Sequence, residues 1–148
     1  PALDLATLVQ ETIQSFVGQA VAKDIDLGFE LAPALVEGDA FQLRDLVDNL
    51  VDNALRYTPA GGRVAVGCAR AGDAVLFTVE DSGPGIPPAR RAAVFERYVR
   101  LDDKTTGSGL GLAIVRDIAL AHGATVLLDE AVGGGARVTV RFAAGPTS

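Results

Sequence analysis

The segment from Gln42 to Pro59 constrains the fold of this 148-residue chain most, because its pattern fits an amphipathic helix. Its apolar residues recur at the i, i+3, i+4, i+7 spacing of a helix that packs one face on a core. Asp39 precedes it as a candidate N-cap, and Thr58-Pro59 followed by two glycines would end it. The apolar positions are Leu43, Leu46, Val47, Leu50, Val51, Ala54 and Leu55.

A second stripe on the same segment is polar and lies roughly a third of a turn from the centre of the apolar one. Two of its members are asparagines, which cost helix propensity relative to alanine. From this helix alone two interpretations stay open: the amides cap something or face solvent, or they hold a ligand. The polar positions are Asn49, Asn53, Arg56 and Tyr57.

Length and composition indicate one domain with a substantial core, since 49% of the residues are apolar. No apolar run has membrane-spanning length and no signal-peptide pattern opens the chain. Because the chain starts at Pro1 without Met, we expect an excised domain over residues 1–143 with a frayed tail at 144–148. A single cysteine, Cys68, excludes an internal disulfide and a Cys-cluster metal site. The net charge of −6 argues against a nucleic-acid partner.

The remaining periodicities predict about three long helices and about five strands, arranged mostly as hairpin pairs. This pattern indicates an α/β (α+β) two-layer sandwich in which a mixed sheet packs against the helices. Expected helices cover residues 3–22 (with a short strand at the start), 41–57, 89–98 and 107–122, and residues 99–106 are expected to form a mobile loop. Expected strands cover residues 26–31, 34–37, 63–70, 74–81, 124–130 and 137–142.

Two further segments contain groups that could bind a ligand. Asp81 ends a strand yet shares the parity of Val79, so its carboxylate points to the buried side and needs a donor partner. Residues 107–112, Gly-Ser-Gly-Leu-Gly-Leu, open a helix with free backbone N–H groups that suit phosphate, although glycines there can also serve tight packing. Basic residues precede this entrance and are either phosphate ligands or a solvated loop: Arg90, Arg91, Arg97, Arg100 and Lys104.

Four boxes follow one another in the chain: Asn-x-x-x-Asn-Ala-x-Arg-Tyr-Thr-Pro, Asp-x-Gly-x-Gly-Ile, Val-Phe-Glu-Arg-Tyr and Gly-x-Gly-Leu-Gly-Leu. Together they resemble the ATP-binding catalytic domain of bacterial sensor histidine kinases. That domain has the Bergerat fold, which type II topoisomerases, MutL and the large heat-shock chaperones share. The boxes span residues 43–115 in the order of the family. The resemblance therefore implies a two-layer sandwich that binds ATP and Mg²⁺.

The resemblance implies a role for each matching residue. Asn53 matches the metal-binding asparagine, Asn49 would position the phosphates, and Arg56 would offset their charge. Asp81 matches the carboxylate that accepts a hydrogen bond from the adenine amino group. Ala136 departs from the family, which often has threonine there, so a hydroxyl near the adenine is missing or supplied by water. Further implied nucleotide contacts are Tyr57, Gly83, Gly85, Ile86, Arg97, Arg100, Lys104, Thr106, Gly107, Ser108, Gly109, Leu110, Gly111 and Leu112.

Fold-mates that hydrolyse ATP carry a glutamate where this chain has Asn49, and a neutral amide cannot act as a general base. The resemblance thus favours a histidine kinase domain that presents the γ-phosphate to a histidine on a separate dimerisation domain, absent from this chain. His122, at a helix end where a cation suits the helix dipole, lacks the following carboxylate of a phosphoacceptor. The alternatives are an ATP-binding regulatory module or ATPase without phosphotransfer, and a structural domain that binds nothing.

The same resemblance implies the setting of the domain. We expect its partners to be its own dimerisation domain and a response regulator. The fragment is expected to be a monomer, whereas its parent is expected to be a homodimeric sensor of the inner membrane with this domain in the cytoplasm. Arg97 and Arg100 have two open interpretations: they contact the phosphates, or they contact the partner domain or solvent.

Overall fold

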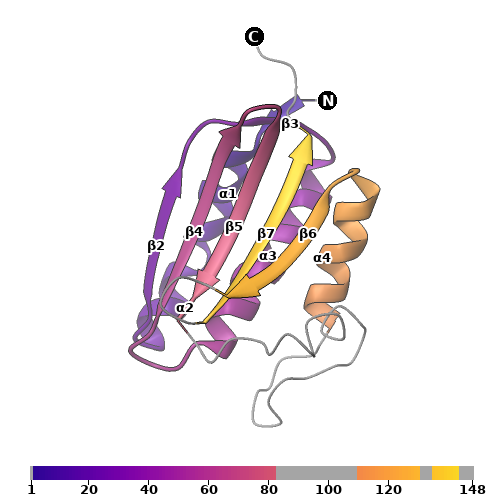
Figure 1. Cartoon of the computed structure of the whole chain (residues 1–148). Helices are drawn as coiled ribbons and strands as arrows, with labels where there is room; N and C mark the ends of the chain where they lie inside the picture. Colours follow the sequence, from indigo (N-terminus) through magenta and orange to yellow (C-terminus); the bar gives the residue numbers. More distant parts are fainter. Residues whose placement is uncertain (1, 83–109, 131–134, 144–148) are drawn as a thin grey trace.

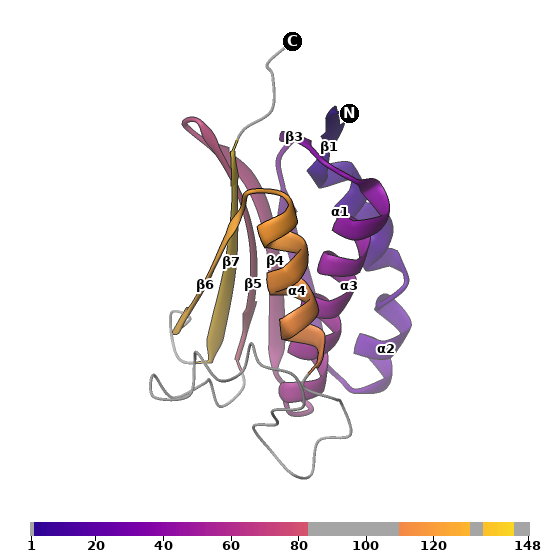
Figure 2. The same cartoon turned by 90° about the vertical axis from the view of Figure 1, so that its right-hand side faces the viewer.

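The computed structural model describes residues 2–82, 110–130 and 135–143. A five-stranded sheet forms one layer and the helices form the other (Figures 1 and 2), which confirms the predicted two-layer α/β fold. A separate two-stranded sheet joins the first and third strands. The elements are β1 (Ala2–Asp4), α1 (Leu5–Gln14), α2 (Val17–Ala22), β2 (Asp26–Leu31), β3 (Leu35–Glu37), α3 (Ala40–Tyr57), β4 (Arg63–Ala71), β5 (Ala74–Asp81), α4 (Leu110–Ala121), β6 (Thr125–Glu130) and β7 (Ala136–Ala143).

The large sheet is mixed, in the order β2-β4-β5-β7-β6. β4 and β5 form the predicted hairpin, with Val64 opposite Asp81 and Ala71 opposite Ala74. The β5–β7 and β6–β7 pairs are also antiparallel. β2 runs parallel to β4. A parallel pair needs a crossover connection, and the chain between these two strands supplies one that contains α3.

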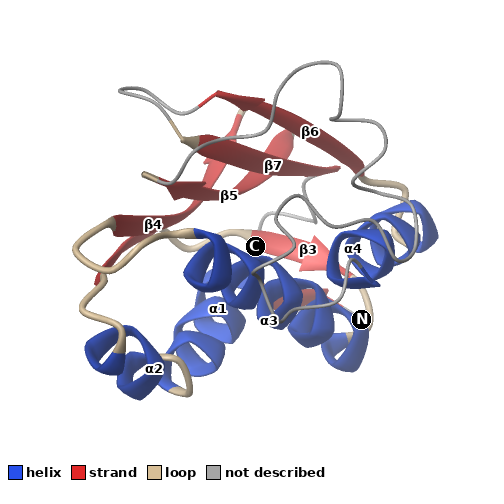
Figure 3. Ribbon diagram, turned by 90° about the horizontal axis from the view of Figure 1, so that it is seen from below, coloured by secondary structure: helices blue, strands red, loops and turns tan. Residues whose placement is uncertain are grey.

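The core lies between the sheet and the helices. Alternate residues of β4 and β5 meet the apolar stripe of α3, and among them Val66 and Phe77 are at most 2% exposed. Burying a side chain of this size stabilises the fold by roughly 1.5–3 kcal/mol. Burial, followed by the charge of Asp4, raises the pKa of the Cys68 thiol to about 12, so this thiol stays protonated. Figure 3 shows the described helices gathered on one face of the sheet.

The first predicted helix, residues 3–22, is instead two helices preceded by the expected short strand. The break lies at Ser15 and Phe16, whose N–H groups bond the carbonyls of Thr12 and Ile13, three residues back. The Ser15 hydroxyl also donates to the Thr12 carbonyl at 2.8 Å. Tight i→i−3 bonds and a competing hydroxyl end an α-helix locally. The expected strand at the start is β1, and it pairs with β3.

α3 begins as predicted, because the Asp39 carboxylate accepts bonds from the N–H groups of Phe41 and Gln42 at 2.9 and 3.1 Å. The Asp39 N–H in turn donates to Nε2 of His122 at 3.1 Å. The other ring nitrogen lies 2.8 Å from the Ile118 carbonyl. His122 therefore joins the end of α4 to the start of α3 through contacts of both ring nitrogens.

Several expectations fall outside the described residues: the helix over 89–98, the loop over 99–106 and the tail over 144–148. The two last predicted strands correspond to β6 and β7. None of the helices in the described part of the chain combines the length and the apolar character that a transmembrane span requires.

Gly38 and Gly18 provide a matched test of this packing. A Cβ on Gly38 would stand 2.7 Å from Nε2 of His122 and 2.9 Å from Cδ1 of Leu43, and the two ring hydrogen bonds prevent the imidazole from moving aside. Gly38→Ala should lower the free energy of unfolding by about 2 kcal/mol. Gly18→Ala, in α2 with nothing within 4 Å, should raise it by about 0.5–1 kcal/mol. Urea denaturation measures both, and equal effects would contradict the assigned role of Gly38.

Candidate functional site

α3 turns two different faces to its surroundings. Its seven-residue apolar stripe is buried against the sheet and neighbouring helices. Asn49, Asn53 and Tyr57 are half-buried at the border of that stripe, and Arg56 is exposed. The amides predicted to hold a ligand are thus fixed in direction by the packing of the opposite face.

Both amides are oriented by the helix that carries them. Nδ2 of Asn49 donates to the Asp45 carbonyl at 2.7 Å, and Nδ2 of Asn53 donates to the Asn49 carbonyl at 2.9 Å. Each amide nitrogen donates one of its two N–H groups to the helix, and each amide oxygen is left to accept. The two amides lie one helical turn apart, so two acceptor oxygens stand in one row along the helix.

The charged groups near the amides are paired within α3. Nε of Arg56 lies 2.7 Å from Oδ2 of Asp52, one turn earlier. Burial, followed by repulsion from Asp45, raises the pKa of Asp48. Asp48 points about 100° around the helix from Asn49, and Asp52 is engaged by a cation. Position 49 itself therefore presents a neutral amide and not a carboxylate, while Asp45 and Asp52 lie one turn away on either side of it.

Lys23 fixes the far end of α3, which sequence reasoning missed. Its Nζ donates to the carbonyls of Leu55 and Arg56 at 2.7 and 2.9 Å. These carbonyls have no partner inside the helix, and a cation also suits a helix C-terminus. The contact spans more than thirty residues of sequence, so no local pattern could reveal it. It holds the last turn of α3, which carries Tyr57.

Asp81 ends β5 with its carboxylate half-buried, as predicted. Its Oδ1 accepts a bond of 3.3 Å from the N–H of Ala136, the first residue of β7. The Ala136 N–H is a donor partner of the kind that a carboxylate on the buried side of a strand needs. Gly135 has a φ of +89°, and a Cβ there would overlap the carbonyl oxygen of Asp81. Gly135 thus permits β7 to start against the end of β5, a role that sequence reasoning did not assign.

The candidate residues come to one end of the sheet. α3 and β5 end there, and α4 and β7 begin there (Figures 1 and 2). Leu112, in the first turn of α4, is 9% exposed. Leu110 and Gly111 also lie in this turn. The other predicted contacts lie outside the described residues: Gly83, Gly85, Ile86, Arg97, Arg100, Lys104, Thr106, Gly107, Ser108 and Gly109.

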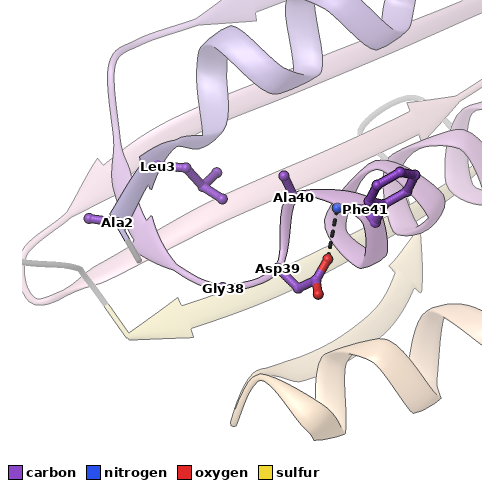
Figure 4. A pocket seen from close by; sticks show the side chains of 6 residues that line it. All are labelled: Ala2, Leu3, Gly38, Asp39, Ala40 and Phe41. Carbon is purple, nitrogen blue, oxygen red and sulfur yellow. Dashed lines mark hydrogen bonds between the residues drawn. The ribbon is translucent and has the colours of Figure 1, made fainter.

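A separate hollow of about 430 Å³ lies at the opposite end of α3 (Figure 4). Asp39 is its charged residue, and this carboxylate already caps the helix. The hollow is far along the helix from Tyr57, so it is not the site of the predicted chemistry. It is lined by Ala2, Leu3, Gly38, Asp39, Ala40 and Phe41.

The donor set of the site suits a hard cation held jointly with a ligand. Across residues 2–82, 110–130 and 135–143, no three His, Cys, Asp or Glu side chains group as a metal cage. An amide oxygen such as Oδ1 of Asn53 is, however, an oxygen ligand. Mg²⁺ commonly takes only one or two protein ligands and completes its shell with phosphate oxygens and water. The residues present therefore fit a metal that arrives with a phosphate ligand.

Comparisons with known proteins identify the family to which this chain is similar. The family of histidine kinase-, DNA gyrase B- and HSP90-like ATPases matches residues 38–146. The signal transduction histidine-protein kinase/phosphatase MprB of Mycolicibacterium vanbaalenii is 47% identical over 116 residues, covering 76% of this chain and 24% of that protein. The chain spans about a quarter of the first curated relatives that it matches.

Solved structures are similar over nearly the whole chain. The mycobacterial sensor histidine kinase MprB has a TM-score of 0.88 at 32% identity, with 99% of both chains covered. Full-length ShkA in complex with AMPPNP has a TM-score of 0.83 at 30% identity, covering 99% of this chain and 32% of that one. The chain therefore belongs to the family of histidine kinase-, DNA gyrase B- and HSP90-like ATPases, and it is a histidine kinase catalytic domain.

Proposed function

We propose that this domain binds Mg–ATP where α3, β5 and α4 meet, and presents the γ-phosphate to a histidine on a separate dimerisation domain. One observation carries the proposal: Asn53 lies in the last turns of α3 and Asp81 ends β5, and these two elements end at the same end of the sheet (Figure 1). Amide oxygens suit the metal–phosphate end of a nucleotide, and a carboxylate suits an amino group on its base.

Asp81 recognises the base. The bond from the Ala136 N–H helps to orient its carboxylate, whose oxygens are hydrogen-bond acceptors. The amino group of adenine can donate to such an acceptor. Guanine has a carbonyl in that place, so two acceptors would face each other, and this mismatch selects adenine nucleotides.

The amides of α3 serve the phosphates. Oδ1 of Asn53 would hold Mg²⁺, and Oδ1 of Asn49 would position the phosphates or their waters. When bound, the metal supplies positive charge between the phosphate oxygens. Arg56 adds a cation nearby, held in place by Asp52. Tyr57 and Leu112 line the nucleotide, as would the predicted contacts that lie outside the described residues.

The reaction is transfer and not hydrolysis. A general base for water needs a carboxylate beside the phosphates, and α3 presents Asn49 there. With no such base, the domain contributes position and charge neutralisation for an external nucleophile. His122 is not that nucleophile, because both of its ring nitrogens are engaged in contacts.

The proposed cellular context is supported by the relatives, whose names are those of sensor kinases and of which the match covers about a quarter. We propose that the parent is a homodimeric membrane sensor whose catalytic domain lies in the cytoplasm. Its partners are its own dimerisation domain and a response regulator, with no nucleic acid. AMPPNP bound to ShkA supports the choice of an ATP analogue as probe.

Asn53 should make binding depend on the metal. We expect AMPPNP to bind the wild-type chain with micromolar affinity in the presence of Mg²⁺ and more weakly with EDTA. Asn53→Ala should bind equally in both conditions, because it lacks the amide oxygen that holds the metal. Isothermal titration calorimetry measures all four affinities, with the exposed Gln42→Ala on the same helix as control. A metal response that persists in Asn53→Ala would remove Asn53 from the metal site.

Asp81 should set base specificity. Asp81→Asn should weaken ATP binding by at least about tenfold, since it loses a charge-assisted hydrogen bond of roughly 1.5–3 kcal/mol. It should also narrow the preference for ATP over GTP, because an amide can donate to a carbonyl. Asp73→Asn makes the same chemical change at a fully exposed position on the other end of the hairpin and should have no effect. Equal wild-type affinities for ATP and GTP would refute the role of Asp81.

Phosphotransfer should require a partner. Incubated with γ-labelled ATP, the chain alone should take up no label, whereas an added dimerisation domain of a homologous sensor kinase should become labelled on histidine. Replacing the partner's acceptor histidine by glutamine is the control and should abolish the signal. If ATP binds but no such partner is labelled, the domain is a nucleotide-binding regulatory module and not a kinase.

A further inference from the structure

Thr58, the residue that ends α3, has a buried hydroxyl without a partner. Its side chain is 0% exposed, and Oγ1 makes no hydrogen bond. In the described part of the chain, Thr12 is the other buried polar side chain, at 5% exposure. The Thr12 hydroxyl donates to the Leu8 carbonyl, one turn back, at 2.7 Å. The two threonines are thus alike in burial and opposite in hydrogen bonding.

At the end of α3, the Thr58 hydroxyl bonds none of the carbonyls behind it, and other donors already bond them. The carbonyl one turn back, that of Ala54, accepts the backbone N–H of Thr58 at 3.1 Å. The next two carbonyls, of Leu55 and Arg56, accept Nζ of Lys23. A buried hydroxyl that is left unpaired is costly, and such a group usually has a partner outside the polypeptide, in water or in a ligand.

The surroundings of Thr58 lead to the residue that follows Asp81. Gly62 separates Thr58 from Ser82: a Cβ on Gly62 would overlap the Thr58 methyl group and lie 2.9 Å from Oγ of Ser82. Ser82 is fixed by two bonds with Arg63, one to its hydroxyl at 2.7 Å and one from its N–H at 3.0 Å. Asp81 itself faces the helix layer, in step with Val79. Thr58 is therefore buried beside the strand end that carries the base-recognising carboxylate.

We propose that Thr58 is a specificity residue for the adenine base. Its hydroxyl forms a hydrogen bond with the purine ring, directly or through one water shared with Asp81. In the complex, the hydroxyl therefore has the partner that it lacks in the protein alone. This inference rests on the proposed function, since it needs an adenine nucleotide at that end of the sheet. A hydroxyl can both donate and accept, so it can serve a ring nitrogen or a water. Removing it leaves a buried polar atom of the ligand unpaired.

The test uses Thr58→Val, which keeps the shape of the side chain and removes its hydroxyl. Thr12→Val makes the same change at the other buried threonine and is the matched control. Thr58→Ser keeps a hydroxyl at position 58. Differential scanning fluorimetry gives the melting temperature of each chain without nucleotide. Calorimetry gives the affinities for ATP and ADP, each with Mg²⁺ and with EDTA. Measuring both properties separates a ligand contact from a structural role.

We expect Thr58→Val to weaken ATP and ADP binding by the same factor, about fivefold to tenfold, with or without the metal. Its melting temperature should be unchanged or higher, because an unpaired buried group has been removed. Thr58→Ser should bind within about twofold of wild type. Thr12→Val should do the reverse of Thr58→Val, with a lower melting temperature and unchanged affinities.

Three results would overturn the proposal while leaving the proposed function intact: wild-type affinity in Thr58→Val, a melting temperature lowered as in Thr12→Val, or a loss confined to Mg–ATP. A wild-type chain that binds neither ATP nor ADP would refute the proposed function, and the role of Thr58 with it.

Discussion

Burial of the apolar stripe of α3 is the interaction on which the rest of the molecule depends. Leu46, Leu50 and their neighbours are at most 2% exposed, and they fix the rotation of the helix about its axis. Since each residue is about 100° from the next, fixing one face fixes every other. The oxygens of Asn49 and Asn53 therefore have a direction set by the core. A core substitution that rotates α3 would change the candidate site without touching a residue of it.

Both ends of α3 are held by residues from distant parts of the chain. His122, which follows α4, bonds the backbone of the N-cap Asp39, and Lys23, which follows α2, bonds the last carbonyls. α4 is thus tied to α3 at the end remote from the candidate site. At the near end, α4 begins with the turn that contains Leu112. The hydrogen bond holds α3 and α4 together at one end, and their apolar residues belong to the same core toward the candidate site.

The sequence predicted what local periodicity encodes. The buried faces of β4 and β5, the stripe of α3 and the N-cap Asp39 all follow from spacing within about twenty residues, and the structure confirms them. It could not predict what depends on distant contacts. His122 and Asp39 are 83 residues apart, and the parallel pairing of β2 with β4 has no local pattern of its own.

The break at Ser15 shows a different limit of sequence reasoning. The apolar spacing continues through it, so periodicity predicted one helix over residues 3–22 where the structure has two. A single hydroxyl bonded to the Thr12 carbonyl, together with i→i−3 backbone bonds, outweighed the pattern. The candidate site was predicted on other grounds, because its residue types are unusual for their positions, and the roles of its residues stay a prediction.

Departures from favourable local chemistry gather at one end of the molecule. Asn49 and Asn53 occupy helix positions that favour other residues, Asp81 carries a carboxylate on the buried side of a strand, and Thr58 buries an unpaired hydroxyl. The opposite end of α3 instead has a satisfied cap and a doubly bonded histidine. Proteins depart from locally favourable choices mainly where function requires it. The concentration of such departures thus supports the candidate site on physical grounds that are independent of any relative.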